Sequence, residues 1–118
     1  MNAGIKLFLC KPIPPRPTFA QDMTEVERKK MQEHVDYWKD LSDRRIAIIF
    51  GPVLDPKGTW GTAIVEVASE SEAHILGKND PAVQAGFTFE VYRIFKMMFA
   101  YFIPQFFMVF EYRSIYSI

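Results

Sequence analysis

The sequence predicts an α+β fold, and three observations carry this prediction. First, 118 residues are enough for one domain with its own hydrophobic core and too few for two. Second, strand-like and helix-like segments follow one another in the order strand, helix, strand, strand, helix, strand. Third, both predicted helices begin at a capping-box pattern. This order is the split βαβ, or ferredoxin-like βαββαβ, arrangement, in which two helices cover one face of an antiparallel sheet.

The first strand and the first helix are expected in the N-terminal part of the chain. A β-branched and aromatic run predicts a strand over residues 5–10, and the prolines after it predict an extended loop to about Met23. Thr24-Glu-Val-Glu27 is a capping box, so a helix is expected from Glu25 to about Ser42. Three- and four-residue spacing gives this helix one apolar stripe, which consists of Met31, His34, Val35, Trp38 and Leu41.

A strand hairpin follows the first helix. Residues 45–50 predict a buried strand, because the run is almost entirely apolar and β-branched or aromatic. Gly51-Pro52 and the turn-rich residues 55–58 predict its end, and residues 62–67 predict the partner strand.

A second helix and a last strand complete the predicted domain. Ser69-Glu-Ser-Glu72 predicts a helix start, with an end near Gly77. Asp80-Pro81 begins one more short turn that Gly86 closes. Apolar and polar residues alternate over residues 87–95, as in a strand with two different faces.

The chain is expected to divide into a domain at residues 1–95 and an aromatic-rich extension at residues 96–118. The extension holds eight of the eighteen aromatic residues and only three charges. It is either an added strand in its own subunit or an arm laid on a partner. The uncovered sheet face also favours self-association, so a homodimer or a higher homo-oligomer is expected.

Composition excludes several classes of function. Fourteen basic residues balance fourteen acidic ones, so no nucleic-acid partner is expected. The apolar residues 97–110 are interrupted by Pro104 and Gln105, and no membrane partner or secretion signal is expected. The single Cys10 favours a reducing compartment, so a cytoplasmic location is expected. There is no phosphate-binding loop, metal-ligand spacing or Gly-x-Ser-x-Gly motif, and no cofactor or metal is expected.

The two histidines differ in their predicted surroundings. His34 lies in the apolar stripe of the first helix, whereas His74 lies in a short polar helix and is given no role. The local pattern alone favours a structural interpretation of His34, as a core histidine bonded to a backbone carbonyl. The alternative is a cleft histidine that exchanges protons near neutral pH, with a carboxylate to orient its ring.

Four other charged positions also have a structural and a functional interpretation. Asp80 is either a helix N-cap or the carboxylate partner of His34, and local pattern does not decide between them. Asp55 is more readily a turn residue than a base. Arg16 and Arg93 could each hold an anionic substrate, although each is more readily a solvated charge.

Four blocks of residues occur in a characteristic order along the chain. They are Arg16-Pro17 and Phe19 before Asp22-Met23-Thr24, Met31-Gln-Glu-His34 with Tyr37-Trp38, residues 50–58 with Trp60-Gly61, and Asn79-Asp-Pro-Ala82 with Ala85-Gly86. Over residues 5 to 95 the chain thereby resembles the YCII-related (YciI-like) proteins, small bacterial proteins of the dimeric α+β barrel class. One departure is Asp43-Arg44-Arg45, which stands where such proteins often have a glycine.

The resemblance implies a ferredoxin-like subunit that pairs with a second copy, and an active site built around a histidine and an aspartate. Related proteins include a dehydrochlorinase acting on a chlorinated hydroxyquinol, so a lyase or isomerase acting on a small cyclic or aromatic metabolite is expected. The alternative is a non-catalytic small-molecule-binding or dimerising module, and cofactor-free oxygenation ranks below both. The candidate site residues are His34 and Asp80 as catalytic groups, with Arg16, Tyr37, Gly51 and Pro52 as substrate-binding groups.

Overall fold

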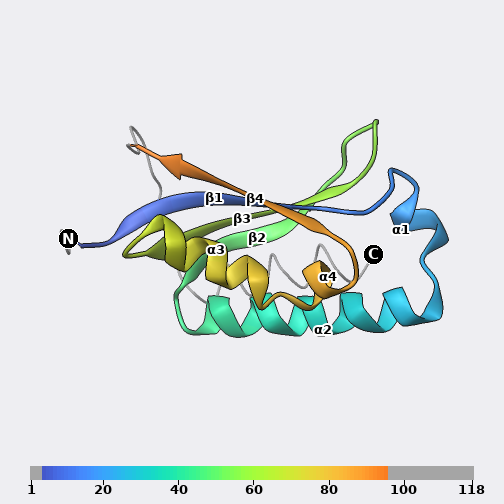
Figure 1. Ribbon diagram of the computed structural model, residues 1–118, viewed down its shortest axis with the longest axis horizontal. Helices are drawn as coiled ribbons and strands as arrows, with labels where there is room; N and C mark the ends of the chain where they lie inside the picture. The colour runs from blue at the N-terminus through green and yellow to red at the C-terminus, as the bar shows by residue number, and fades with distance from the viewer. Residues whose placement is uncertain (1–3, 96–118) are drawn as a thin grey trace.

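The computed structural model describes residues 4–95 (Figure 1), and the predictions for the extension at residues 96–118 lie outside the described residues. Four strands form one antiparallel sheet in the order β2-β3-β1-β4. They are β1 (Lys6–Ile13), β2 (Ala47–Val53), β3 (Trp60–Val67) and β4 (Thr88–Ile94). The predicted α+β, ferredoxin-like arrangement of the subunit is therefore confirmed.

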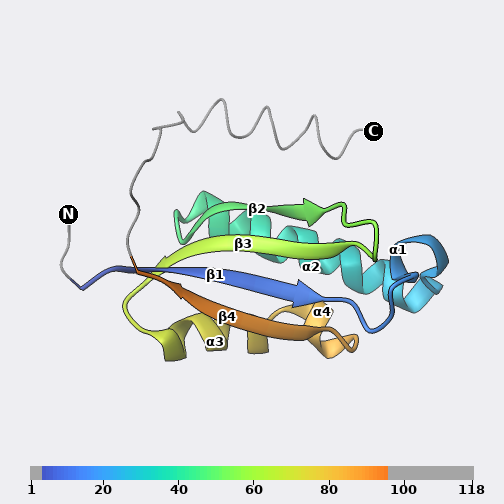
Figure 2. The ribbon, with the colours of Figure 1, turned by 90° about the horizontal axis from the view of Figure 1, so that it is seen from above.

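Helices cover one face of this sheet. They are α1 (Phe19–Asp22), α2 (Glu25–Asp43), α3 (Glu70–Lys78) and α4 (Pro81–Gln84). Figure 1 shows α2, α3 and α4 on the same side of the strands, and Figure 2 shows the sheet lying over them. Within residues 4–95, no helix has the length and apolar character that crossing a membrane requires.

Helix α2 begins and ends close to where its sequence predicts. The Thr24 hydroxyl accepts a hydrogen bond from the Glu27 amide at 3.1 Å, and the Glu27 carboxylate accepts one from the Thr24 amide at 2.9 Å. This reciprocal capping box satisfies two amides that the first turn leaves without partners. Two residues beyond the helix, Arg45 has a φ of 61°, a left-handed conformation that favours glycine.

Two predictions for the N-terminal segment are wrong. Strand β1 continues through Pro12 to Ile13, because pairing with β3 stops at Cys10 while pairing with β4 continues. Pro12 thus stands where only one neighbouring strand requires hydrogen-bond partners. The loop predicted to reach Met23 contains the short helix α1, whose Phe19 is buried in a cluster with residues from the end of the domain.

The strand predicted as buried over residues 45–50 is half-exposed. Strand β2 lies at the edge of the sheet, and Ile48 and Ile49 are 37% and 52% exposed. Its register against β3 shifts between Ala47 and Ile49, so the side chains do not alternate simply. The strand also continues through Gly51-Pro52 to Val53, which an edge position tolerates.

The core fills the space between the sheet and the helices. The largest of its completely buried apolar side chains are Trp38 from α2, Phe8 from β1 and Val65 from β3. Trp38 stacks on Phe89 of β4, with ring centroids 6.3 Å apart and an interplanar angle of 17°. Trp38 therefore joins α2 to the sheet.

Gly77 of α3 lies directly against the Phe89 ring, and any Cβ at this position would overlap that ring. We therefore expect Gly77→Ala to lower the free energy of unfolding by about 1–3 kcal/mol, as overpacking a filled core does. Urea denaturation measures this value. The exposed Ile75 of the same helix gives the matched control, Ile75→Ala, which should change stability by less than about 0.5 kcal/mol. Equal stability of both variants would contradict the close contact.

Candidate active site

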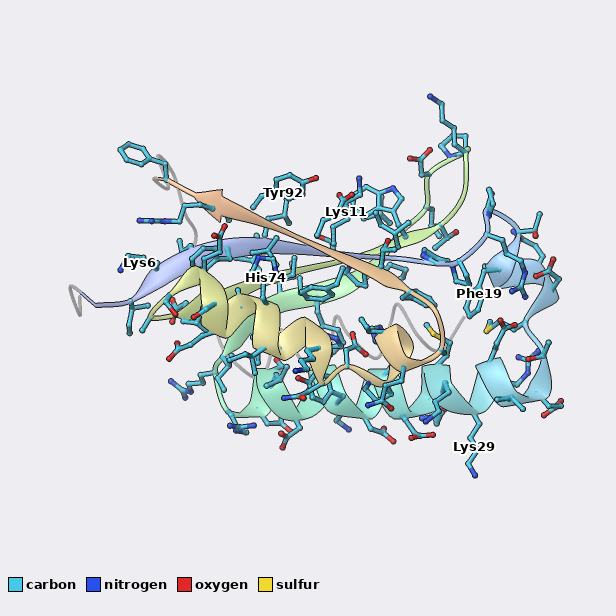
Figure 3. The ribbon with its side chains drawn as sticks, viewed as in Figure 1. Lys6, Lys11, Phe19, Lys29, His74 and Tyr92 are labelled. Carbon is cyan, nitrogen blue, oxygen red and sulfur yellow. The ribbon has the colours of Figure 1, made fainter. Side chains whose placement is uncertain are left out.

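A cavity of about 140 Å³ lies where α1, α2 and the ends of β1, β2 and β3 meet. Its wall is largely apolar, and five aromatic side chains contribute to it: Phe19, Trp38, Phe50, Trp60 and Phe87. Figure 3 shows Phe19 at the α1 end of the molecule, on the side of the sheet that faces α2. Among the described residues that line the cavity, His34 is the one titratable group.

The His34 ring contacts the Asp80 carboxylate. The Nδ1 atom of His34 lies 2.7 Å from Oδ1 of Asp80, although the two residues are 46 positions apart in the sequence. The histidine side chain is 15% exposed and the aspartate side chain is 0% exposed. The sequence-based expectation that these two groups meet is therefore met by the geometry.

Asp80 is both a helix cap and the partner of His34, so the two alternatives for this residue are not exclusive. Its Oδ1 atom also accepts a hydrogen bond from the Ala82 amide at 2.9 Å, which caps α4. Its Oδ2 atom accepts one from Nε1 of Trp38 at 2.8 Å. Three donors thus surround a carboxylate that has no contact with solvent, as a buried charge requires.

The acceptor character of Asp80 selects one tautomer of the neutral His34 ring. A carboxylate accepts hydrogen bonds, so in the neutral imidazole Nδ1 carries the hydrogen and Nε2 carries the lone pair. No other described residue bonds Nε2. The His34 ring also stacks on Phe87, with centroids 6.4 Å apart and an interplanar angle of 29°. These contacts hold the His34 ring in one orientation in the cavity wall.

The four predicted substrate-binding residues separate into two pairs. Gly51 and Pro52 line the cavity, whereas Arg16 and Tyr37 are not among its lining residues. The Tyr37 hydroxyl donates to the Leu76 carbonyl at 2.8 Å. Burial, together with the negative charge of Asp80, raises the pKa of Tyr37 to about 12. Tyr37 thus joins α2 to α3 and does not face the cavity.

Arg16 is occupied by two carboxylates. Its guanidinium donates to Glu27 at 2.8 and 2.9 Å and to Asp22 at 2.8 Å, and it lies over the Phe19 ring. These bonds tie α1 to the start of α2. Arg16 therefore holds α1 against α2 and is not among the residues that line the cavity.

Asp55, Arg93 and His74 are not among the residues that line the cavity. Asp55 accepts hydrogen bonds from the Lys57 amide and from Nε1 of Trp60, and these bonds lower the pKa of its carboxyl group. It is therefore the turn residue that the sequence favours. Arg93 lies over the Phe8 ring, and His74 is exposed on α3. Within residues 4–95, no group of three His, Cys, Asp or Glu side chains could hold a metal ion.

The ion pair between Arg16 and Glu27 gives a pH-dependent prediction. Hydrogen bonds from Arg16 and from the Thr24 amide lower the pKa of Glu27 from 4.5 to about 2. Because the pKa of Glu27 is lower in the folded state than in the unfolded chain, its ionised carboxylate stabilises the fold at pH values above the unfolded pKa. This stabilisation is lost as the pH falls toward 2. We expect thermal melts between pH 5 and pH 2 to show a smaller loss of stability for Glu27→Gln than for wild type. The exposed Glu33 gives the control, Glu33→Gln, which should follow wild type. If all three proteins lost stability equally over this pH range, the Arg16–Glu27 ion pair would not stabilise the fold.

Comparisons with known proteins agree with the fold and with the block pattern. The model of the YCII-related domain family matches residues 8–98. Among solved structures, the chain is similar to 5-chloro-2-hydroxyhydroquinone dehydrochlorinase (TftG) from Burkholderia phenoliruptrix AC1100, in complex with 2,5-dihydroxybenzoquinone. The two are 29% identical with a TM-score of 0.56, over 75% of this chain and 92% of that one. No curated protein matches the sequence.

Proposed function

This chain belongs to the YCII-related domain family, and from that premise we propose that it is a cofactor-independent acid/base enzyme of the lyase or isomerase type. One observation carries the proposal: the titratable group in the cavity wall, His34, is bonded through Nδ1 to the buried Asp80. The similarity to a dehydrochlorinase supports an enzyme of this type.

In the proposed mechanism, Nε2 of His34 removes a proton from a hydroxyl or an activated carbon of the substrate. For a chlorinated hydroxyhydroquinone, the reacting form is the keto tautomer, in which one hydroxyl hydrogen has moved to the chlorine-bearing carbon and made that carbon saturated. The electron pair released then forms a new double bond to this carbon, and chloride leaves with the electrons of its bond. The proton stays on His34, whose positive charge Asp80 stabilises. Loss of HCl completes a lyase reaction, and return of the proton to another carbon completes an isomerase reaction. Neither route needs an oxidant.

The size of the cavity supports a single-ring substrate. At about 140 Å³ it is close to the cavities of about 150 Å³ that hold one benzene ring in other proteins. The aromatic side chains in its wall suit a planar ring. We therefore propose substrates such as chlorinated hydroxyhydroquinones, the class on which the similar dehydrochlorinase acts.

Chloride release from 5-chloro-2-hydroxyhydroquinone, measured without oxygen to prevent air oxidation, tests the proposal. We expect chloride release by the full-length protein and none above background for His34→Ala. A panel of hydroxylated aromatic rings and small lactones extends the test to isomerase substrates. Binding of 2,5-dihydroxybenzoquinone without turnover of any compound would favour the alternative, a non-catalytic small-molecule-binding module.

We also propose that the subunit pairs through the sheet face opposite the helices. Four cross-strand neighbours form a row across that face: Ile49, Ile64, Leu9 and Tyr92. Figure 3 shows Tyr92 on the side of the sheet away from the helices. Ile49 and Tyr92 are 52% and 51% exposed, so burying this row in a dimer would remove apolar surface from water.

Light scattering tests the homodimer. We expect the full-length protein to have twice the mass of the chain, and Ile49→Glu to have the mass of one chain, because a buried charge opposes pairing. Lys29→Glu, on the exposed face of α2, is the control and should remain dimeric. A single-chain mass for wild type at micromolar concentration would exclude the dimer.

A further inference from the structure

Trp38 contacts the His34–Asp80 pair through its indole nitrogen. Asp80 has two carboxylate oxygens, and His34 and the Ala82 amide both bond the same one, Oδ1. The other oxygen, Oδ2, accepts its hydrogen bond from Trp38 alone among the described residues, at 2.8 Å. Without that bond, the donors that remain on the carboxylate among the described residues are the two on Oδ1.

The Trp38 ring is itself held from several sides. It is 1% exposed, stacks on Phe89 at 6.3 Å, lies 6.5 Å from the Phe50 ring, and meets the Tyr37 ring edge to face at 5.8 Å. A ring packed in this way has little freedom to follow a moving carboxylate. Its N–H group is therefore a fixed point for the plane of the carboxylate.

The orientation of Asp80 determines the orientation of His34. A histidine with one ring nitrogen bonded to a fixed carboxylate is restricted to one tautomer and one ring position. We propose that Trp38 is a positioning residue, whose N–H fixes the carboxylate plane of Asp80 and thereby keeps Nε2 of His34 available to a ligand in the cavity. This inference rests on the role proposed above for His34.

Trp60 provides a matched comparison. It also lines the cavity, and its indole nitrogen also donates to an aspartate, Asp55, at 3.1 Å. That aspartate belongs to the β2–β3 turn and makes no contact with His34. Trp38→Phe and Trp60→Phe thus remove the same chemical group from the same cavity wall, and only the first removes a bond to the His34 partner.

Nitrogen NMR of the full-length protein with labelled histidine rings tests the inference without a substrate. Two histidines give two sets of ring signals, and the exposed His74 is the internal reference. We expect the Nδ1–H proton of His34 to exchange with solvent about tenfold faster in Trp38→Phe, the scale expected from losing one hydrogen bond to a charged group. Trp60→Phe should leave this exchange unchanged.

A second comparison separates positioning from simple loss of packing. Phe89→Leu removes the ring that stacks on Trp38 but keeps the indole N–H. A purely structural role for Trp38 predicts that Phe89→Leu and Trp38→Phe accelerate His34 exchange equally. The positioning role predicts a clearly smaller effect of Phe89→Leu at matched thermal stability. Equal acceleration would overturn the inference.

His34→Ala decides the matter if Trp38→Phe does not fold. This variant removes one donor from the Asp80 carboxylate that Trp38 also bonds. The indole proton of Trp38 should shift in this variant, and that of Trp60 should not. A Trp38 signal that stays fixed would overturn the inference. If these NMR results are obtained but no ring compound is turned over, the proposed enzymatic function is wrong, and the positioning role of Trp38 still stands.

Discussion

Replacement of His34 by alanine is expected to lower turnover by at least about 10²–10⁴-fold, the usual contribution of a general base. The effect on the fold should be small. Asp80 keeps its bonds to Trp38 and to the Ala82 amide when the imidazole is removed, and the His34 side chain is partly open to the cavity. Steady-state kinetics with a turned-over ring compound, together with a thermal melt, measures both effects.

His74→Ala is the matched control for this prediction. His74 is the other histidine of the chain and is exposed on α3. Its variant should retain full activity and wild-type stability. If His34→Ala also kept full activity, His34 would have no catalytic part. If it lost thermal stability without a separate effect on ligand binding, the core-histidine interpretation would return.

Replacement of Asp80 by alanine should have the largest effect on stability. Three donors lose their acceptor at once: Nδ1 of His34, Nε1 of Trp38 and the Ala82 amide. Two of these donors, Nε1 of Trp38 and the Ala82 amide that caps α4, are buried. Each costs about 1–3 kcal/mol without a partner, so we expect a total of about 2–6 kcal/mol. Urea denaturation measures the loss. A variant as stable as wild type would contradict the three-donor arrangement.

Asp80→Asn separates stability from chemistry. The amide has nearly the same shape and keeps one acceptor oxygen for the helix cap. Its NH₂ group, however, must face either Trp38 or His34, and both of these groups donate in the wild type. If it faces His34, the ring changes tautomer and Nε2 carries a hydrogen, so it no longer acts as a base. We expect most of the activity to be lost with much of the stability retained. Full activity of Asp80→Asn would show that the carboxylate charge is not needed.

Local sequence patterns predicted the elements whose causes are local. The capping box at Thr24 and Glu27 depends on residues three apart, and the N-cap at Asp80 depends on the amide of Ala82. Such interactions are set within one turn of the chain, so the sequence predicts them directly. The hairpin of β2 and β3 has a local cause of the same kind, a turn-rich loop between two strand-like runs.

Features that depend on distant partners could not be predicted in this way. Helix α1 exists where the sequence predicts a loop, because Phe19 packs on Phe87 of a later segment. Arg16 resembles a substrate-binding cation until Asp22 and Glu27 are seen to occupy its donors. The exposure of β2 follows from its edge position, which is a property of the whole sheet.

The candidate site was predicted partly from local sequence pattern and partly from the family resemblance. Local pattern favoured a core histidine at His34 and did not decide whether Asp80 is a helix cap or the partner of His34, and the family resemblance suggested that the two residues meet. Trp38 was expected in the apolar stripe of α2, and its burial agrees with that expectation. Its bond to Asp80 had no sequence signal, because a tryptophan in an apolar stripe is ordinarily a packing residue. A buried indole N–H needs an acceptor, but this requirement does not identify which residue supplies it.

The structure of a complex with 2,5-dihydroxybenzoquinone tests the role proposed for one atom, Nε2 of His34. We expect the ring of this compound inside the cavity, with one of its oxygens about 2.6–3.2 Å from Nε2. We also expect that Nδ1 of His34 remains bonded to Asp80, as it is without a ligand. If the ligand binds elsewhere, or if the His34 ring turns Nε2 away from it, His34 is not the base that acts on a ring substrate.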